Sequence, residues 1–396
     1  MPLSLKVPSF QDLTAYEKTV VEELRRRTFH DLTPKMQEDE TIFYRFCKAR
    51  DYDLEEAEIM LRKHIIWAKE IKIETFLTSY KPPEVLSKYY SHGCLCHDKE
   101  GNVVTYFDIG NLDMKGLWSS AKQSDGLKTV LLYVQKDLME QELQNKKLGT
   151  TFTKIGYIYN LQNLSFLEAV NKKTIELFLG YYKIYLDNYP ERMKYVYIIN
   201  AKPYINFAFS IFKPIFSPAF LEKLKFYGSS GWKEDLLKII DADQLPAFLG
   251  GNKTDPDGNP LCKTFVKHGQ QIPESYYLNY RKKLLSCSSH LKKLSVQRSS
   301  MEEMRFEITE RGSLLEWEFE LKSRDIDFAV YFNSFGEESK LVKIIPKQRM
   351  DTYYGPEKNY VKCENPGIYT IVFDNSYSWV HSKEVFYRIR VRKPNE

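Results

Sequence analysis

Residues 154–200 decide the fold of the central region, and they read KIGYIYNLQNLSFLEAVNKKTIELFLGYYKIYLDNYPERMKYVYIIN. Short runs rich in β-branched and aromatic residues stand at both ends of this stretch, at 154–160 and 194–200, and they predict strands. Between them, apolar residues within 167–188 recur at the 3.6-residue spacing of a helix. Two strands joined by a helix of this length predict a βαβ unit, in which the strands lie parallel in one sheet.

The segments on either side of this stretch repeat the alternation. Runs at 103–109 and 223–227 predict further strands, and 126–147 predicts a second long helix. We therefore expect the central region to be an α/β domain whose sheet contains parallel pairs.

The N-terminal region is predicted to be helical. Residues 40–49 place their apolar side chains on one helical face. Asp53 is a predicted N-cap, because Glu56 follows at the position that completes a capping box. Two prolines, Pro82 and Pro83, then end this helical region.

The C-terminal region changes class again. Apolar residues alternate with polar ones in the stretches 315–321, 326–332, 369–373 and 385–391. This two-residue period, with Pro and Gly turns between the stretches, predicts an all-β sandwich. Ahead of it, residues 275–301 carry six Lys and Arg residues and no acid, which is typical of a solvated linker or of a weak membrane-facing strip.

The composition of the 396 residues limits the function classes. With 58 Lys and Arg against 53 Asp and Glu, the net charge of +5 is too small to argue for a nucleic-acid partner. The N-terminus lacks the apolar core of a signal peptide, and no uncharged apolar stretch reaches the roughly 18–20 residues of a membrane span. The six cysteines are dispersed, as in a protein with reduced thiols. We therefore expect a cytoplasmic protein that associates with membranes peripherally and transiently.

Catalytic motifs are missing from the sequence. It contains neither a G-x-x-x-x-G-K-[ST] phosphate loop nor a G-x-S-x-G nucleophile elbow. The cysteines and histidines of 92–97 are crowded into one short segment, whereas a closed zinc site normally draws on separated ligand pairs. We therefore expect no catalytic residue, no metal site and no cofactor, and we do not predict an enzyme.

Residues 203–224 carry the most unusual apolar pattern in the chain. One helical face is expected to hold five large apolar side chains, Phe207, Ile211, Phe212, Ile215 and Phe216. Pro214 and Pro218 should interrupt this helix. A buried core helix is the default interpretation of such a stripe, but the prolines make it poorly suited to rigid packing. The alternative is a movable gate over a hydrophobic cavity.

Several motifs resemble those of the CRAL-TRIO lipid-transfer family. They are RFCKAR at 45–50, NYPER at 188–192, IINA at 198–201, FKP at 212–214 and LPAFLGG at 245–251. The C-terminal motifs PGIY at 366–369 and FDNSYS at 373–378 resemble a GOLD domain. Together, the two sets are most similar to the animal tocopherol-associated protein (supernatant protein factor) group.

The resemblance implies a domain organisation and a function. The implied regions are a helical lead-in over 1–75, a CRAL-TRIO lipid-binding domain over 76–272, a basic linker over 273–301 and a GOLD-type β-sandwich over 302–396. The implied function is that of a carrier. It would bind one hydrophobic lipid, of the tocopherol, squalene or phospholipid class, in a gated pocket and transfer it between membranes. The alternative is a lipid-sensing trafficking scaffold that recruits protein partners through the GOLD domain.

The resemblance carries over only part of the family's ligand-binding set. The matching positions are Arg50, Glu191 and Lys223. Asp51 stands where phosphatidylinositol-binding members have a lysine, and a Ser/Thr pair of those members aligns with Ile155 and Tyr157. These differences favour a less polar ligand over phosphatidylinositol. We expect the bound lipid to be contacted by Arg50, Tyr157, Ile158, Glu191, Ile198 and Lys223.

Overall fold

The computed structural model of the protein describes residues 13–278, 291–322, 325–336, 341–352 and 356–394. The chain divides into two compact units, Met1–Tyr276 and Tyr277–Glu396. No helix within these described ranges is long and apolar enough to cross a lipid bilayer.

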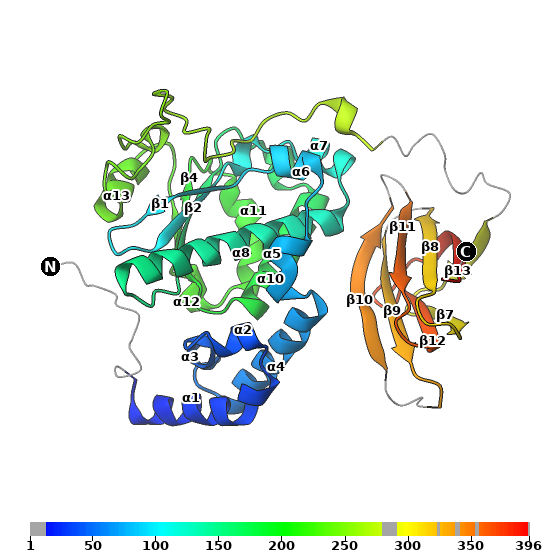
Figure 1. Ribbon diagram of the computed structural model, residues 1–396. Coiled ribbons are helices and arrows are strands. Elements are labelled where there is room, and N and C mark those ends of the chain that lie inside the picture. Colours follow the sequence, from blue (N-terminus) through cyan, green and yellow to red (C-terminus); the bar gives the residue numbers. More distant parts are fainter. Residues whose placement is uncertain (1–12, 279–290, 323–324, 337–340, 353–355, 395–396) are drawn as a thin grey trace. The chain divides into compact units, whose positions relative to one another are not determined.

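The first unit begins with a helical lead-in, drawn in blue in Figure 1. Its elements are α1 (Ala15–Thr28), η2 (Phe29–Asp31), α2 (Pro34–Gln37), α3 (Ile42–Lys48), α4 (Leu54–Glu70) and α5 (Ile73–Ser79). Asp53 caps α4 as predicted, because its side chain accepts a hydrogen bond from the backbone N–H of Glu56. The helices enclose a small core of their own, centred on Leu24, Phe46 and Leu61.

A five-stranded sheet follows, in the order β1-β2-β3-β4-β5. Its strands are β1 (Gly93–His97), β2 (Val103–Phe107), β3 (Ile155–Asn160), β4 (Met193–Ile199) and β5 (Leu224–Phe226). β1 is antiparallel to β2, and the other neighbours are parallel. Every residue of β3 is buried, as expected for a parallel strand covered on both faces. The predicted α/β class is confirmed.

Helices cover both faces of this sheet. They are α6 (Glu84–Tyr89), α7 (Met114–Ser120), α8 (Gln123–Leu148), α9 (Phe166–Ala169), α10 (Lys172–Asn188), α11 (Ile205–Phe212), α12 (Pro218–Leu221) and α13 (Trp232–Ile239). One core contains side chains of α8, α10 and α11, and a second core on the other face contains those of α13. Short 3₁₀ turns complete the unit: η3 (Ile109–Asn111), η4 (Lys213–Ile215), η5 (Ala247–Leu249) and η6 (Glu274–Tyr276).

The helix predicted over 167–188 is two helices in the structure. α9 ends at Ala169 and α10 begins at Lys172, with Asn171 between them as the N-cap. The Asn171 side chain accepts a hydrogen bond from the backbone N–H of Thr174 over 3.2 Å. This capping satisfies a helix-terminal donor and so stabilises a helix start inside the apolar pattern.

The second unit is an antiparallel β-sandwich, as predicted. One sheet has the order β10-β9-β12-β7 and the other β11-β8-β13-β6. The strands are β6 (Lys292–Val296), β7 (Met301–Ile308), β8 (Leu314–Leu321), β9 (Asp325–Asn333), β10 (Val342–Asp351), β11 (Glu357–Lys362), β12 (Gly367–Asp374) and β13 (Lys383–Arg392). Phe319, Phe328 and Phe373 meet between the sheets with ring centroids 5.1–5.5 Å apart.

One part of the predicted basic linker, 273–301, belongs to the sandwich. β6 pairs with β13, from Lys383 opposite Val296 to Tyr387 opposite Lys292. Leu294 and Val296 point inward in alternation, which gives this strand a face to bury despite its flanking lysines. Within the linker, residues 279–290 lie outside the described residues, whereas 273–278 are described and contain η6.

Candidate functional site

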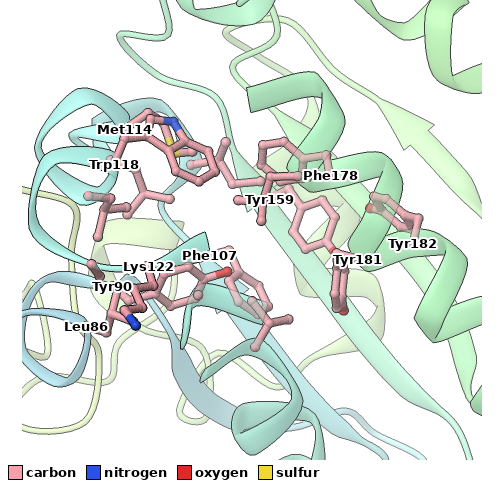
Figure 2. A pocket seen from close by; sticks show the side chains of 17 residues that line it. Leu86, Tyr90, Phe107, Met114, Trp118, Lys122, Tyr159, Phe178, Tyr181 and Tyr182 are labelled. Carbon is pink, nitrogen blue, oxygen red and sulfur yellow. The ribbon is translucent and has the colours of Figure 1, made fainter. Parts of the chain in front are cut away.

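An apolar cavity lies between the sheet and the helices α7, α8 and α10. Its volume is about 60 Å³. Figure 2 shows the rings of Tyr159, Phe178, Tyr181 and Tyr182 on one side of it, with Trp118 facing them across the cavity. Tyr159 comes from β3 and the other three rings of that side come from α10, whereas Trp118 comes from α7.

A second apolar cavity, of about 140 Å³, lies under α11 and α12. Its outer wall consists of Ile205, Ala208, Phe209, Phe216 and Phe220. Its floor includes Leu161 and Ile198 of the sheet region. The wall is therefore formed by the segment that the sequence suggested as a gate.

The two cavities are neighbours. They share the lining residues Ile109, Met114, Tyr159, Phe178 and Tyr182. Each is smaller than the roughly 300–1,000 Å³ of an ordinary ligand pocket. A long apolar molecule therefore fits only if the shared rings move and the two cavities join.

Tyrosine hydroxyls give these apolar walls a few polar points. The hydroxyls of Tyr157 and Tyr185 lie 3.4 Å apart in the same core, behind the residues that line the two cavities. Burial raises the pKa of Tyr182 to about 12, and burial also raises the pKa of Tyr159 and Tyr181 far above the usual range. These groups stay neutral at physiological pH, so they can bind a ligand only through hydrogen bonds and ring contacts.

A larger cavity of mixed polarity, about 630 Å³, lies on the lead-in side of α10. Arg50, Glu191 and Lys223 all line it, so the structure brings together the three charged residues that the sequence suggested. Glu191 Oε1 lies 3.6 Å from Lys223 Nζ, and its Oε2 lies 3.9 Å from Lys154 Nζ. Burial lowers the pKa of Lys154, because the charged amine is poorly solvated there.

The backbone around this cavity is unusual at Glu191. Its φ is 56°, in the left-handed region that costs a non-glycine residue about 1–2 kcal/mol. Such a conformation persists only where the surroundings fix it, and it is over-represented at functional sites. Here it places the carboxylate between two lysines at the cavity wall.

The three apolar ligand-binding candidates lie in different surroundings. Ile198 lines the second apolar cavity, and Tyr157 lies in the same core, behind the ring of Phe107. The prediction for Ile158 needs correction, because this side chain packs with Trp232 in the core on the opposite face of the sheet. Alternate residues of a strand point to opposite faces, so Ile158 cannot share a cavity with its neighbours.

The five gate candidates differ in where their side chains lie. Phe216 is buried and lines the second cavity, whereas Phe207 and Ile211 are 61% and 41% exposed. The side chains of Phe212 and Ile215 lie outside the described residues. The inner face of α11 is formed by Ile205, Ala208 and Phe209 instead.

Two groups of lining residues were not predicted as ligand contacts. Phe178 and Tyr181 of α10 were expected only as part of a helical apolar face, and no pattern singled out Tyr182 or Trp118. The signal present was the unusual ring content of α10, where two adjacent tyrosines follow Phe178 and Gly180. Aromatic residues have only modest helix propensity, so propensity alone does not account for this cluster of rings.

The histidines of the 92–97 segment face carboxylates. His92 Nε2 lies 3.0 Å from Asp137 Oδ1, and His97 Nε2 lies 3.6 Å from Glu140 Oε1. In the part of the chain that the structure describes, no three His, Cys, Asp or Glu side chains are grouped as metal ligands.

Comparisons with known proteins agree with this architecture. Residues 86–251 match the model of the CRAL/TRIO domain. Protein ctg-1 of Caenorhabditis elegans is 24% identical over 378 residues, which are 94% of this chain and 97% of the relative. Protein real-time of Aedes aegypti is 27% identical over 297 residues, 72% of this chain, and this chain spans 44% of the relative's length.

A solved structure shares the fold. The crystal structure of Sfh5 has a TM-score of 0.50 at 16% identity, over 65% of this chain and 94% of that chain. Residues 86–251, which match the CRAL/TRIO model, include every lining residue of the two apolar cavities. The family match at residues 86–251 indicates a lipid-binding or lipid-transfer domain.

Proposed function

Starting from the CRAL/TRIO domain at residues 86–251, whose family consists of lipid-binding and lipid-transfer proteins, we propose a carrier function. The chain binds one hydrophobic lipid in the apolar cavities under α11 and α12 and transfers it between membranes. One observation carries this proposal: the outer wall of the second cavity is a short, interrupted pair of helices with apolar residues on both faces.

The inner face of this wall is held mainly by ring contacts. The Phe216 ring centroid lies 4.5 Å from that of Phe220 and 5.2 Å from that of Tyr182. Phe209 contacts Phe226 with centroids 4.9 Å apart. Apolar contacts of this kind have no fixed direction, so the wall can slide outward without leaving buried hydrogen-bonding groups unpaired.

The two ends of the wall differ. At the start of α11, the Tyr204 hydroxyl donates a hydrogen bond to the backbone oxygen of Leu164. At the other end, Ser217 and Pro218 interrupt the helix before α12. We infer that the segment pivots at Tyr204 and opens at the α11–α12 junction.

The outer face of the wall supplies a membrane-contacting surface in this proposal. Phe207 and Ile211 of α11 are exposed, and so are Phe166 and Leu167 of α9. The two helices contact each other, and the Phe166 ring lies 5.7 Å from that of Tyr204. Burying each such side chain in a bilayer yields about 1.5–3 kcal/mol, which can offset the cost of opening the wall.

The proposed ligand has a large apolar part and a small polar end. A sixteen-carbon chain costs about 13 kcal/mol to expose to water, so loading and release must happen against a membrane. We propose the tocopherol, squalene or phospholipid class, with any polar head in the cavity around Arg50, Glu191 and Lys223. In this proposal the sandwich is of the GOLD type and the protein acts in the cytoplasm.

The deciding experiment uses the purified full chain. Lipids are extracted and identified by mass spectrometry, and transfer is measured between phosphatidylcholine donor and acceptor vesicles. We expect a copurified lipid near one per chain and transfer that depends on protein concentration. Protein without lipid and without transfer would refute the carrier, whereas loading without transfer would favour the scaffold function.

A further inference from the structure

The loop between β12 and β13 of the C-terminal sandwich carries an exposed apolar tip. We propose that this tip, Trp379 and Val380, inserts into the interface of a lipid bilayer. The tip belongs to the second compact unit, whereas the cavities and α11 belong to the first. The inference goes beyond lipid carriage and gives the sandwich a membrane-anchoring function.

The exposure at this tip is unusual for such residues. Trp379 is 82% exposed and Val380 is 70% exposed. Met301, the first residue of β7, is exposed as well, and it pairs with Asp374 where β12 runs into the loop. Large aromatic residues are mostly buried in folded proteins, as Trp317 is in the same sandwich.

The loop below the tip is held by a network of hydrogen bonds. The buried Asn375 side chain donates from Nδ2 to the backbone oxygens of Gln297 and His381, each over 2.9 Å. The Ser378 N–H donates to the Asn375 oxygen over 3.0 Å, and the Ser299 N–H donates to the Ser378 oxygen over 2.9 Å. The tip is thus presented in a fixed conformation, so docking requires little further ordering of the loop.

Tyr377 anchors the loop from the inner side. Its hydroxyl donates to Asp325 Oδ1 over 2.8 Å. The guanidinium carbon of Arg349 lies 3.3 Å from the centroid of the Tyr377 ring. The aromatic ring of Tyr377 is therefore used for internal packing, while that of Trp379 is presented to the outside.

The charges near the tip suit a lipid surface. Neither the loop 375–382 nor the adjoining segment 297–301 contains an Asp or a Glu. Arg298 provides the cationic group in these two segments. No carboxylate of these segments would repel lipid phosphates, and an indole ring with one N–H prefers the membrane–water interface.

The size of the patch favours a bilayer over a protein partner. A stable protein interface needs about 800 Å² from each partner, whereas one Trp side chain buries about 150–250 Å². Trp379, Val380 and Met301 together stay well short of that area. Insertion into a bilayer requires no complementary surface, so a small projecting tip is sufficient.

The test measures binding of the full chain to phosphatidylcholine vesicles by flotation. The double variant Trp379→Ser, Val380→Ser should bind at least about fivefold more weakly. Trp379→Phe should keep most of the binding, because it preserves an apolar ring. Tyr360→Ser is the matched control, since Tyr360 is 60% exposed on β11 and should not contribute. Unchanged binding of the double variant, or an equal loss with Tyr360→Ser, would overturn the proposal.

A second readout separates insertion from an indirect effect. The emission of Trp379 is obtained as the difference between the wild-type protein and Trp379→Phe. It should shift to the blue on vesicle addition and be quenched by brominated phosphatidylcholine. An unshifted, unquenched difference spectrum would overturn the proposal even if binding fell. Copurified lipid should be unchanged in the double variant, so failure here is distinguishable from failure of the carrier function.

Discussion

Arg192 donates a hydrogen bond from Nη2 to Asp39 Oδ2 over 2.8 Å, and so connects the turn between α10 and β4 with the helical lead-in. Arg45 donates to the same oxygen over 2.5 Å. Burial lowers the pKa of Arg45 to about 10, whereas the two guanidinium groups together overcome the effect of burial on Asp39 and hold its pKa well below the usual range. One carboxylate thus compensates two cations that the fold encloses between its helical and α/β parts.

We predict that Asp39→Asn lowers the free energy of unfolding by roughly 3 kcal/mol, because it leaves Arg45 and Arg192 together without a counter-charge. Urea unfolding followed by circular dichroism measures this. The matched control is Glu316→Gln, which removes the carboxylate that pairs with Arg390 and Arg392 at the surface and should cost less than about 1 kcal/mol. Equal losses in the two variants would contradict a special role of the buried cluster.

A pH dependence follows from His64 in α4. Its Nδ1 lies 3.1 Å from Asn188 Oδ1, and its ring lies between those of Phe46 and Trp67. Burial lowers the pKa of His64 to about 4, against about 6.5 in the unfolded chain. Because the folded pKa is depressed, the stabilisation is complete above pH 6.5 and is lost as pH falls toward 4.

The loss should reach up to about 3 kcal/mol at pH 4. It is measured as the difference between wild type and His64→Gln in the pH dependence of the unfolding free energy. Glutamine can still form a hydrogen bond with Asn188 but does not titrate. Parallel curves for the two proteins between pH 7 and pH 4 would show that another group is responsible.

The sequence was most informative where burial is complete. β3 and β4 could be predicted because strands covered on both faces read as continuous apolar runs. The break at Asn171 could also have been predicted, since Asn171 and Ser165 both stand three residues ahead of a residue whose N–H they cap. The prediction of one helix over 167–188 followed the apolar spacing and did not take these capping residues into account.

The cavities could not be predicted in the same way. α11 is apolar on both sides, so periodicity did not reveal that Ala208 faces inward and Phe207 outward. Alternation along β3 places Ile158 on the opposite face of the sheet from Tyr157 and Tyr159. The strand sequence does not show, however, on which of the two faces a cavity remains. A cavity remains where rings from segments far apart in the sequence do not pack closely, and local sequence patterns do not show this.

Blocking the second cavity tests the ligand site. Ala208 is buried and lines this cavity, so Ala208→Trp should fill it and lower the copurified lipid at least severalfold. Ser210→Trp on the exposed side of α11 is the control for adding the same ring to the same helix. Mass spectrometry of extracted lipid measures both. Full loading of Ala208→Trp would place the ligand elsewhere.

The charged cavity makes a second prediction about the ligand. Glu191→Gln removes the carboxylate that lies near Lys154 and Lys223, so the cavity becomes more positive. Loading of phosphatidylinositol in competition with phosphatidylcholine should rise about fivefold, which corresponds to about 1 kcal/mol of relieved repulsion. Glu222→Gln, an exposed acid next to Lys223, is the control. An unchanged preference would mean that the head group does not reach this cavity.

The outer face of the gate separates membrane contact from ligand binding. Phe207→Ser combined with Ile211→Ser removes exposed apolar area while keeping Ala208 and Phe209 on the inner face. We expect at least tenfold slower transfer between vesicles, because each lost side chain removes about 1.5 kcal/mol or more of membrane attraction. Copurified lipid per chain should stay near the wild-type value.

Leu148→Ser, which removes an exposed apolar residue at the end of α8, controls for a general loss of surface apolarity. Transfer at the wild-type rate would refute membrane contact through α11, whereas loss of loading would show that these side chains act on the cavity instead.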